Sequence, residues 1–257
     1  MKTSNKILFG LIGFISFICL CFLVYAKSQL IPKDQTGFDS NQIKASGVIS
    51  STKYEVIEFN AIEIGDHYEV FLSQGSNSVT IETDDNLLDY VAPKIEGNIL
   101  KLTKKSSKGI QNFRGFKIFI TAKNLETITA HDFAKVQIDS SFQAENLFLK
   151  LTESSEIRLN EVIIEKEIRI MASNFTKIKM SGSAEKMSLD AKGSAVIDAL
   201  NFEAKEAILF SSDFVKAKIN TKDRLEINAT GSSEIAYIGE PRISQSIRDF
   251  VKINQIQ

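Results

Sequence analysis

The sequence predicts an all-β protein: a right-handed parallel β-helix (a β-solenoid) with turns of about 20 residues, preceded by an N-terminal transmembrane helix. Three features predict this fold: an uncharged run near the N-terminus, short stretches in which apolar and polar residues alternate, and a phrase that returns seven times in the C-terminal half. With 25% charged and 43% hydrophobic residues, the chain has the composition of a folded protein.

The N-terminal run, residues 7–26, carries no charge and follows Lys2 and Lys6. As a helix it would be about 30 Å long, which is enough to cross the hydrocarbon core of a bilayer. We therefore expect residues 1–29 to be a single-pass membrane anchor, with the C-terminal domain in the periplasm or outside the cell. The alternative is a signal peptide that is cleaved near Ala26, which would release a secreted protein.

The segment after the anchor, residues 30–52, is polar, contains scattered Gly, Ser and Pro, and shows no sustained periodicity. This composition predicts a flexible linker. Both cysteines, Cys19 and Cys21, lie within the apolar run. The exported part therefore has no thiol and can form no disulfide.

Residues 53–257 are expected to form one β-solenoid domain, with irregular strands over residues 53–124 and seven repeats over residues 125–257. Each repeat has two short strands with apolar residues at alternate positions, so a single repeat cannot close a core. Stacking the repeats about 4.8 Å apart buries these faces and pairs the backbone groups. The expected inward residues are Leu147, Leu149, Leu151, Ile168, Ile170, Ala172, Met187, Leu189, Ala191, Leu225, Ile227 and Ala229 in the first strands, and Val136, Ile157, Ile178, Ile197, Ala217, Ile235 and Ile253 in the second strands.

A turn joins the two strands of each repeat, and one position in it alternates between a ring and a hydroxyl. We expect this position to point into the core, because a phenyl ring is longer than one layer is thick and alternation with Ser keeps the packing dense. The alternative is a coil of about forty residues that gathers the rings on one side. The first geometry places the Cα atoms of Phe133 and Phe175 two layers apart, about 9.6 Å, and the second places them one layer apart, about 4.8 Å. The alternating residues are Phe133, Ser154, Phe175, Ser194, Phe214, Ser232 and Phe250, and the turn residues before them include Asp132, Asn174, Gly193, Asp213, Gly231 and Asp249.

The last repeats show two further details. Gln245 and Gln255 replace apolar residues of earlier repeats, which predicts a wettable cap at the end of the stack. In the stretch AILFSS, Ile208 and Phe210 fall at outward positions. Either the register slips there or an apolar patch is exposed.

No catalytic, cofactor-binding or metal-binding set can be assembled from the sequence. The two histidines, His67 and His131, lie far apart in the chain, and we expect both to be surface or strand-end residues. Asp84 and Asp85 lack the spacing of an EF-hand and are expected to serve a turn or a helix cap. The sequence has no nucleophile elbow and no Gly-rich phosphate loop. A net charge of −1 and a pI near 6.2 argue against nucleic acid as a partner.

Several segments carry a resemblance to a known family: FNAIEIGDHYEVFLSQG (59–75), VTIETDDNLLDYV (79–91), IEGNILKL (95–102), and the phrases GSAVID and GSSEIA. Through these segments, residues 54–257 resemble the auto-transporter adhesin head GIN domain family. This family was formerly a domain of unknown function and is common in Bacteroidetes. The resemblance implies a right-handed β-helix in an exported protein with recurring Gly-Ser-Gly-Asp turns. It implies no catalytic residues. Only three places match those turns here: Gly182-Ser183, Gly193-Ser194 and Gly231-Ser232.

These observations favour a non-enzymatic, membrane-anchored β-solenoid of the cell envelope that acts as an adhesin-like binding or display module. Its expected partners are the membrane, through residues 7–26, and glycans or other envelope proteins. One alternative is a carbohydrate-active β-helix enzyme, which rests on fold analogy. Another is a structural or signalling component of the envelope.

Overall fold

The computed structural model describes residues 42–104, 108–111, 114–138 and 142–256. The predicted anchor, residues 1–29, and the first part of the predicted linker lie outside these residues. Within the described ranges, no helix is long and apolar enough to cross a membrane. Lys44–Gln257 forms one compact unit.

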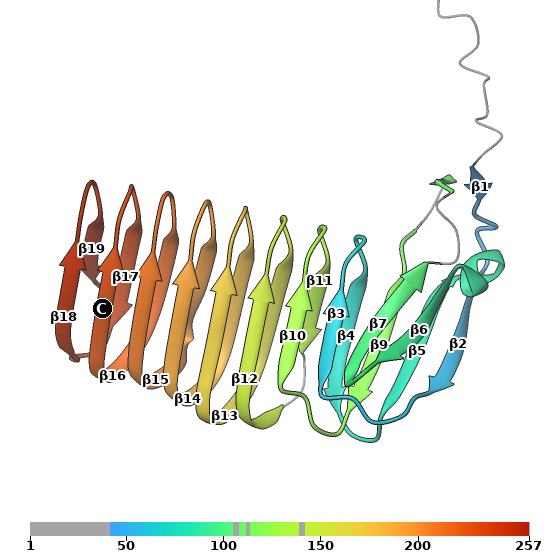
Figure 1. The fold of residues 1–257 in the computed structure, drawn as a ribbon, viewed down its shortest axis with the longest axis horizontal. Helices are drawn as coiled ribbons and strands as arrows, with labels where there is room; N and C mark the ends of the chain where they lie inside the picture. Colours follow the sequence, from blue (N-terminus) through green and yellow to red (C-terminus); the bar gives the residue numbers. More distant parts are fainter. Residues whose placement is uncertain (1–41, 105–107, 112–113, 139–141, 257) are drawn as a thin grey trace, which may run out of the picture. The chain divides into compact units, whose positions relative to one another are not determined.

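Long strands stacked in parallel make up most of this unit (Figure 1). The alignment runs from Leu147 to Ile168, Met187, Ala207 and Leu225, so each coil takes 18 to 21 residues. This register confirms the all-β stacked fold and the short coil, and it excludes the coil of about forty residues. The hand of the coil stays a prediction. The long strands are β12 (Gln143–Leu151), β13 (Glu156–Ala172), β14 (Lys177–Ala191), β15 (Val196–Ser211) and β16 (Lys216–Ala229).

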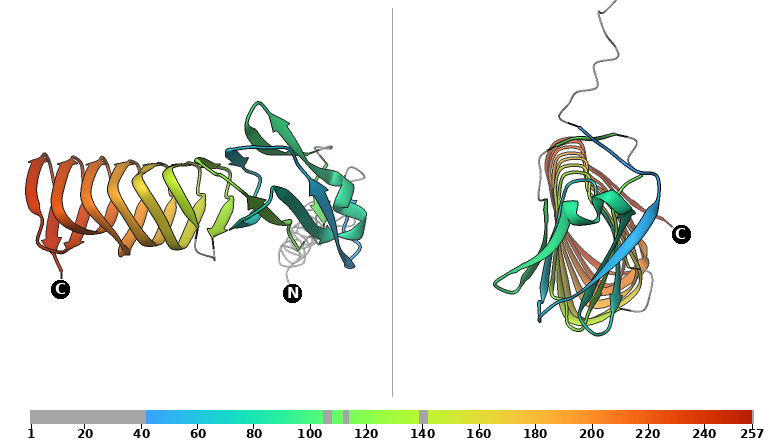
Figure 2. Two further views of the ribbon diagram at one scale, coloured as in Figure 1. Left: turned by 90° about the horizontal axis from the view of Figure 1, so that it is seen from below. Right: turned by 90° about the vertical axis from the view of Figure 1, so that its right-hand side faces the viewer.

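Each coil has two long sections, which stack into two faces, seen end-on in Figure 2. In β12–β16 a short paired section, such as residues 162–164, joins the two long ones on the side opposite the tight turn. Face A joins β3 and β10 to the C-terminal halves of β12–β16 and to β18. Face B joins β4 and β11 to the N-terminal halves of β13–β16 and to β17 and β19. The bounds are β3 (Ala61–Ile64), β4 (Glu69–Gln74), β10 (Thr127–Ala130), β11 (Lys135–Ile138), β17 (Glu234–Ile238), β18 (Arg242–Ile247) and β19 (Lys252–Gln255).

The core lies between the two faces. The alternate residues predicted to point inward are buried throughout β11–β17, because side chains along a strand alternate between the two sides of a sheet. A second buried column follows the turns and consists of small or β-branched residues. Its members are Ala134, Ser155, Thr176, Ala195, Val215 and Ser233.

The N-terminal end of the stack does not follow the order of the chain. β7 pairs in parallel with β3, and β9 pairs in parallel with β4, so these two strands form a layer beyond β3 and β4. Antiparallel strands then cover this end: β5 pairs with β2 and β9, and β6 pairs with β7. The helix-like stretch DDNLLDYVAPK forms a short 3-10 helix, Asp85–Tyr90. The remaining strands are β1 (Ile43–Lys44), β2 (Ile49–Glu55), β5 (Ser78–Asp84), β6 (Val91–Glu96), β7 (Ile99–Lys104), β8 (Ile110–Gln111) and β9 (Lys117–Ala122).

The C-terminal end of the stack is formed by β18 and β19, which pair with β16 and β17. Every residue of β18 is exposed, and both Gln245 and Gln255 face solvent. The expected wettable cap is therefore confirmed. Ile243 and Ile247 stay partly exposed beside Gln245.

The predicted interior column of rings is wrong. Phe133, Phe175, Phe214 and Phe250 are 53%, 67%, 65% and 82% exposed. The turn that joins the two faces is too tight to keep the strand alternation, so the ring position lies at its tip. The next residue, such as Ala134, fills the core instead.

Candidate functional site

The tips of the tight turns form one edge of the stack, which we call the turn edge. It comprises the residue pairs 66–67, 132–133, 153–154, 174–175, 193–194, 213–214, 231–232 and 249–250. The first residue of every pair has a positive φ, between 47° and 78°. Gly, Asn and Asp accept this conformation with the least strain, which explains why they dominate this position.

Two of the exposed phenylalanines are also strained. Phe133 has φ 63° and Phe175 has φ 66°, a region that bulky side chains avoid. In the first of these turns Ala134 N donates to His131 O at 3.0 Å, which closes a two-residue turn that usually takes Asn-Gly or Asp-Gly. Neither core packing nor backbone preference therefore favours a ring at these positions.

The rings recur on every second coil along the turn edge. Backbone hydrogen bonds join consecutive tips, for example Ser154 N to Asn174 O at 2.9 Å and Phe250 N to Gly231 O at 2.8 Å. Neighbouring rings are therefore two layers, or about 9.6 Å, apart. At the N-terminal end of the row, the His67 ring stacks on Phe133 with centroids 4.7 Å apart and planes 12° apart. We call His67, Phe133, Phe175, Phe214 and Phe250 the aromatic ridge.

Aspartates and glycines fix the backbone beneath the C-terminal part of the ridge. The carboxylate of Asp213 accepts from Gly193 N at 3.3 Å, and that of Asp249 accepts from Gly231 N at 3.1 Å. Each aspartate thus bonds the turn of the preceding coil as well as shaping its own. A Cβ added to Gly231 would lie 2.6 Å from Asp213 N. Glycine is needed there because two successive turns approach so closely.

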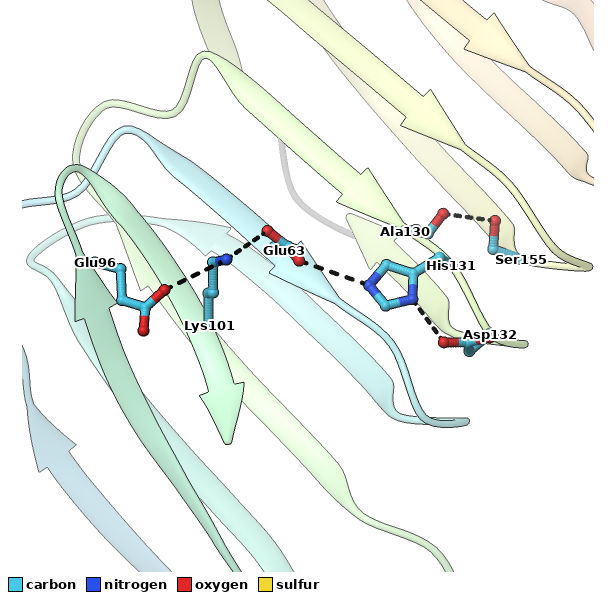
Figure 3. A network of polar contacts seen from close by, with 7 residues as sticks. All are labelled: Glu63, Glu96, Lys101, Ala130, His131, Asp132 and Ser155. Carbon is cyan, nitrogen blue, oxygen red and sulfur yellow. Dashed lines mark hydrogen bonds and ion pairs between the residues drawn. The ribbon is translucent and has the colours of Figure 1, made fainter. Parts of the chain in front are cut away.

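A row of charged side chains crosses the coils at the N-terminal end of the turn edge (Figure 3). Lys101 lies between Glu96, at 3.4 Å, and Glu63, at 3.1 Å. Glu63 is 3.9 Å from His131 Nε2, and His131 Nδ1 is 2.8 Å from the Asp132 carboxylate. The hydrogen bond to Glu63 raises the pKa of Lys101. The hydrogen bond with His131, and a second with Glu153, lower the pKa of Asp132.

The three side chains of His131, Asp132 and Glu153 offer ligand atoms that lie within 4.8 Å of one another. One imidazole and two carboxylates are a donor set that could hold a divalent cation. All three side chains are partly or fully exposed, and His131 is already bonded to Asp132. These bonds give the cluster a structural role at the turn, which needs no ion.

The sequence did not reveal that the two histidines are neighbours. His67 N donates to Asp132 O at 2.9 Å, and His131 N donates to Ile64 O at 2.9 Å, so their turns stack directly. Gly65 permits this approach, because a Cβ there would clash with the His131 ring. Both histidines lie in or beside a turn that follows a short strand, and this shared pattern is the one feature of the sequence that could have indicated that they are neighbours. Both histidines do lie in turns or at a strand end, as expected.

The other acidic candidates have structural roles. Asp84 accepts a hydrogen bond from Gly47 N at 2.6 Å and is buried, and Asp85 begins the 3-10 helix. Ser155 lies next to the histidine cluster, but its buried hydroxyl donates to Ala130 O at 3.0 Å (Figure 3). Because this hydroxyl is buried and already donates to a backbone carbonyl, Ser155 is not a candidate nucleophile.

The fold and the turn edge define a class: a repeat-built β-solenoid with a row of exposed rings on a rigid backbone. Within that class, the chain belongs to the family described as "Putative auto-transporter adhesin, head GIN domain", which matches residues 58–241. This membership confirms the resemblance found in the sequence.

Solved structures share the fold. A protein from Bacteroides fragilis described as a "putative adhesin" is 24% identical, with a TM-score of 0.78 over 83% of this chain and 100% of that chain. A protein from Parabacteroides merdae, also described as a "putative adhesin", is 22% identical, with a TM-score of 0.66 over 84% of this chain and 99% of that chain. A protein from Parabacteroides distasonis described as a "Putative lipid binding protein" is 21% identical, with a TM-score of 0.65 over 84% of this chain and 100% of that chain. No curated protein matches the chain.

Proposed function

We propose that this protein is a non-enzymatic, adhesin-like binding module of the cell envelope and that the aromatic ridge is its binding surface. The observation that carries the proposal is the exposure of Phe175, Phe214 and Phe250 at positions where they stabilise little. Residues held in sparsely populated backbone conformations cluster at functional sites, and Phe175 is such a residue.

The ridge is suited to an extended ligand. Its rings lie on stacked turns whose backbone is fixed by hydrogen bonds between coils, so little ordering is needed on binding. Rings two layers apart present a regular row of apolar surfaces, and Asp213 and Asp249 place carboxylates beside them. An apolar body next to hydrogen-bonding groups is what sugar recognition requires. We therefore propose a glycan as the ligand, with another envelope protein as the second candidate.

The proposal includes the location of the protein. We propose that residues 7–26 hold it in a membrane as a single-pass anchor and that the solenoid lies on the outer side of that membrane. The support is the length of the uncharged run and membership of a family of proposed adhesins. Fractionation of cells, with protease added to intact spheroplasts, would test it. Protection of the solenoid from the protease would contradict an external location.

The binding proposal is tested with a glycan array and with envelope-protein pull-downs, using the wild-type chain and a variant that carries Phe175→Ser, Phe214→Ser and Phe250→Ser. Serine is the residue that alternate coils already hold at this position, so the triple variant should fold normally. We expect wild type to bind at least one glycan class and the variant to lose most of that binding. Equal binding by both would refute the ridge as the site. Cleavage of the bound glycan would favour the carbohydrate-active enzyme instead.

A further inference from the structure

A second surface feature lies on face A beside the turn edge, over the last coils of the stack. It is a hollow of about 290 Å³ lined by Asp190, Phe210, Asn228, Ser246 and Arg248, together with hydroxyl residues of the adjoining turns. The stretch AILFSS, residues 207–212, supplies Phe210, Ser211 and Ser212 to its lining. The outward-facing Phe210 of this stretch therefore lies in the hollow.

The register shows that Phe210 faces outward without any slip. Asp190, Phe210 and Asn228 are aligned on adjacent strands, and Ser246 aligns with Asn228 on the last coil. The neighbours Leu209 and Ser211 are buried, as the alternation requires, while Phe210 is 50% exposed. The aligned row spans three layer steps, or about 14 Å. The core is complete without this ring.

The lining combines one aromatic ring with polar groups of several kinds. The amide of Asn228 donates to Glu226 at 3.2 Å, which fixes its orientation. The Asp190 carboxylate and the Arg248 guanidinium have no side-chain partner among residues 42–104, 108–111, 114–138 and 142–256. The hollow thus offers a ring face and a free acceptor on the aligned row, and a free donor from Arg248, which follows the end of β18 in the adjoining turn.

From this arrangement we infer that the hollow is a saccharide subsite, in which a sugar ring stacks on Phe210 while its hydroxyl groups bond to Asp190, Asn228 and Ser246. A pyranose has an apolar C–H face and a rim of hydroxyl groups, which matches an aromatic ring flanked by polar side chains. The length of the row fits a short oligosaccharide better than a single sugar. Arg248, at the far end, would select a sugar that bears a carboxylate.

This inference rests on the proposed glycan-binding function and adds the hollow as a second binding site for the glycan. Phe210 lies at the end of β15 and Phe214 lies at the tip of the turn that follows it, so a glycan that lies on the ridge can continue into the hollow. The two positions use different side chains and can be removed separately. A second copy of this chain, docked through Phe210 and Ile208, is the competing occupant.

The test uses the full chain and isothermal titration with three probes: maltotriose, chitotriose and tri-galacturonate. We expect at least one probe to bind wild type, and Phe210→Ser to weaken that binding by about tenfold or more. Asp190→Asn should weaken it too. Phe119→Ser is the matched control, because Phe119 is also a partly exposed ring on a strand face, at the other end of the stack, and stacks on Phe71. It should bind like wild type.

The outcomes separate the hollow from the ridge. Loss of binding in Phe210→Ser with full binding in the triple ridge variant supports the subsite and refutes the ridge proposal. The reverse result keeps the ridge and overturns the subsite. Failure of all three probes to bind wild type overturns the inference. So does sedimentation that shows a dimer of wild type which Phe210→Ser dissociates, because the occupant would then be a second copy.

Discussion

Replacing Phe175 by Asn tests whether the rings of the turn edge contribute to binding rather than to stability. Phe175 is 67% exposed and has φ 66°. Asparagine is among the residues that adopt a positive φ most readily, and it keeps a polar surface at the tip of the turn. The change therefore removes the ring and relieves backbone strain at the same position.

The two effects nearly cancel. Phe buries about 150–250 Å² when it is fully enclosed, so a ring that is two-thirds exposed loses at most about 80 Å², or about 2 kcal/mol. Relief of the left-handed conformation returns about 1–2 kcal/mol. The free energy of unfolding should thus change by no more than about 1 kcal/mol, which shifts the melting temperature by about 2–4 °C in a domain of this size.

Thermal unfolding followed by circular dichroism measures the shift. Ile178→Asn is the control, because Ile178 is buried in the next strand and its replacement leaves both a cavity and an unpaired polar group in the core. That variant should lose about 3 kcal/mol or more. If Phe175→Asn lowered the melting temperature as far as Ile178→Asn does, the ring would be a core residue and the binding surface would have no basis.

Three further predictions concern the backbone and charges of the turns. Gly231→Ala should lower the melting temperature clearly more than Gly97→Ala, because both have a positive φ but only at Gly231 does a Cβ meet neighbouring backbone; equal shifts would show that the turns do not pack closely. Gly65→Ala should displace the His131 ring and change its proton NMR resonances, while unchanged resonances would mean that the ring does not lie over Gly65. The lowered pKa of Asp132 means that its charged form is favoured on folding, so its contribution is present above the unfolded-state pKa and is lost as the pH falls through the folded-state pKa. Asp132→Asn should therefore lose less thermal stability than wild type between pH 5 and pH 2, and an equal loss would contradict the contact with His131.

The coil length and the inward residues could be predicted because both depend on local alternation. Leu147, Ile168 and Met187 align as expected, since a strand that buries one side must repeat every second residue. The same rule failed at Phe133 and Phe175. A tight turn with positive φ interrupts the alternation, and the sequence pattern does not show by how much.

The order of the layers at the N-terminal end could not be predicted. The layer formed by β3 and β4 comes first in the chain, but it lies in the middle of three layers. The layer of β7 and β9 lies on one side of it, and the layer of β10 and β11 lies on the other. Such pairing depends on contacts between segments distant in sequence, which no local pattern encodes. The cluster around His131 escaped notice for the same reason, because Glu63 and Glu153 reach it from neighbouring coils.

The most direct test of ligand binding by the exposed rings is fluorine NMR of the chain labelled with 4-fluorophenylalanine, titrated with a glycan found on the array. We predict that the resonances of Phe175, Phe214 and Phe250 shift with the ligand, while those of Phe142 and Phe202, which are fully buried, stay in place. Saturable binding that leaves the ridge resonances unmoved would contradict the account.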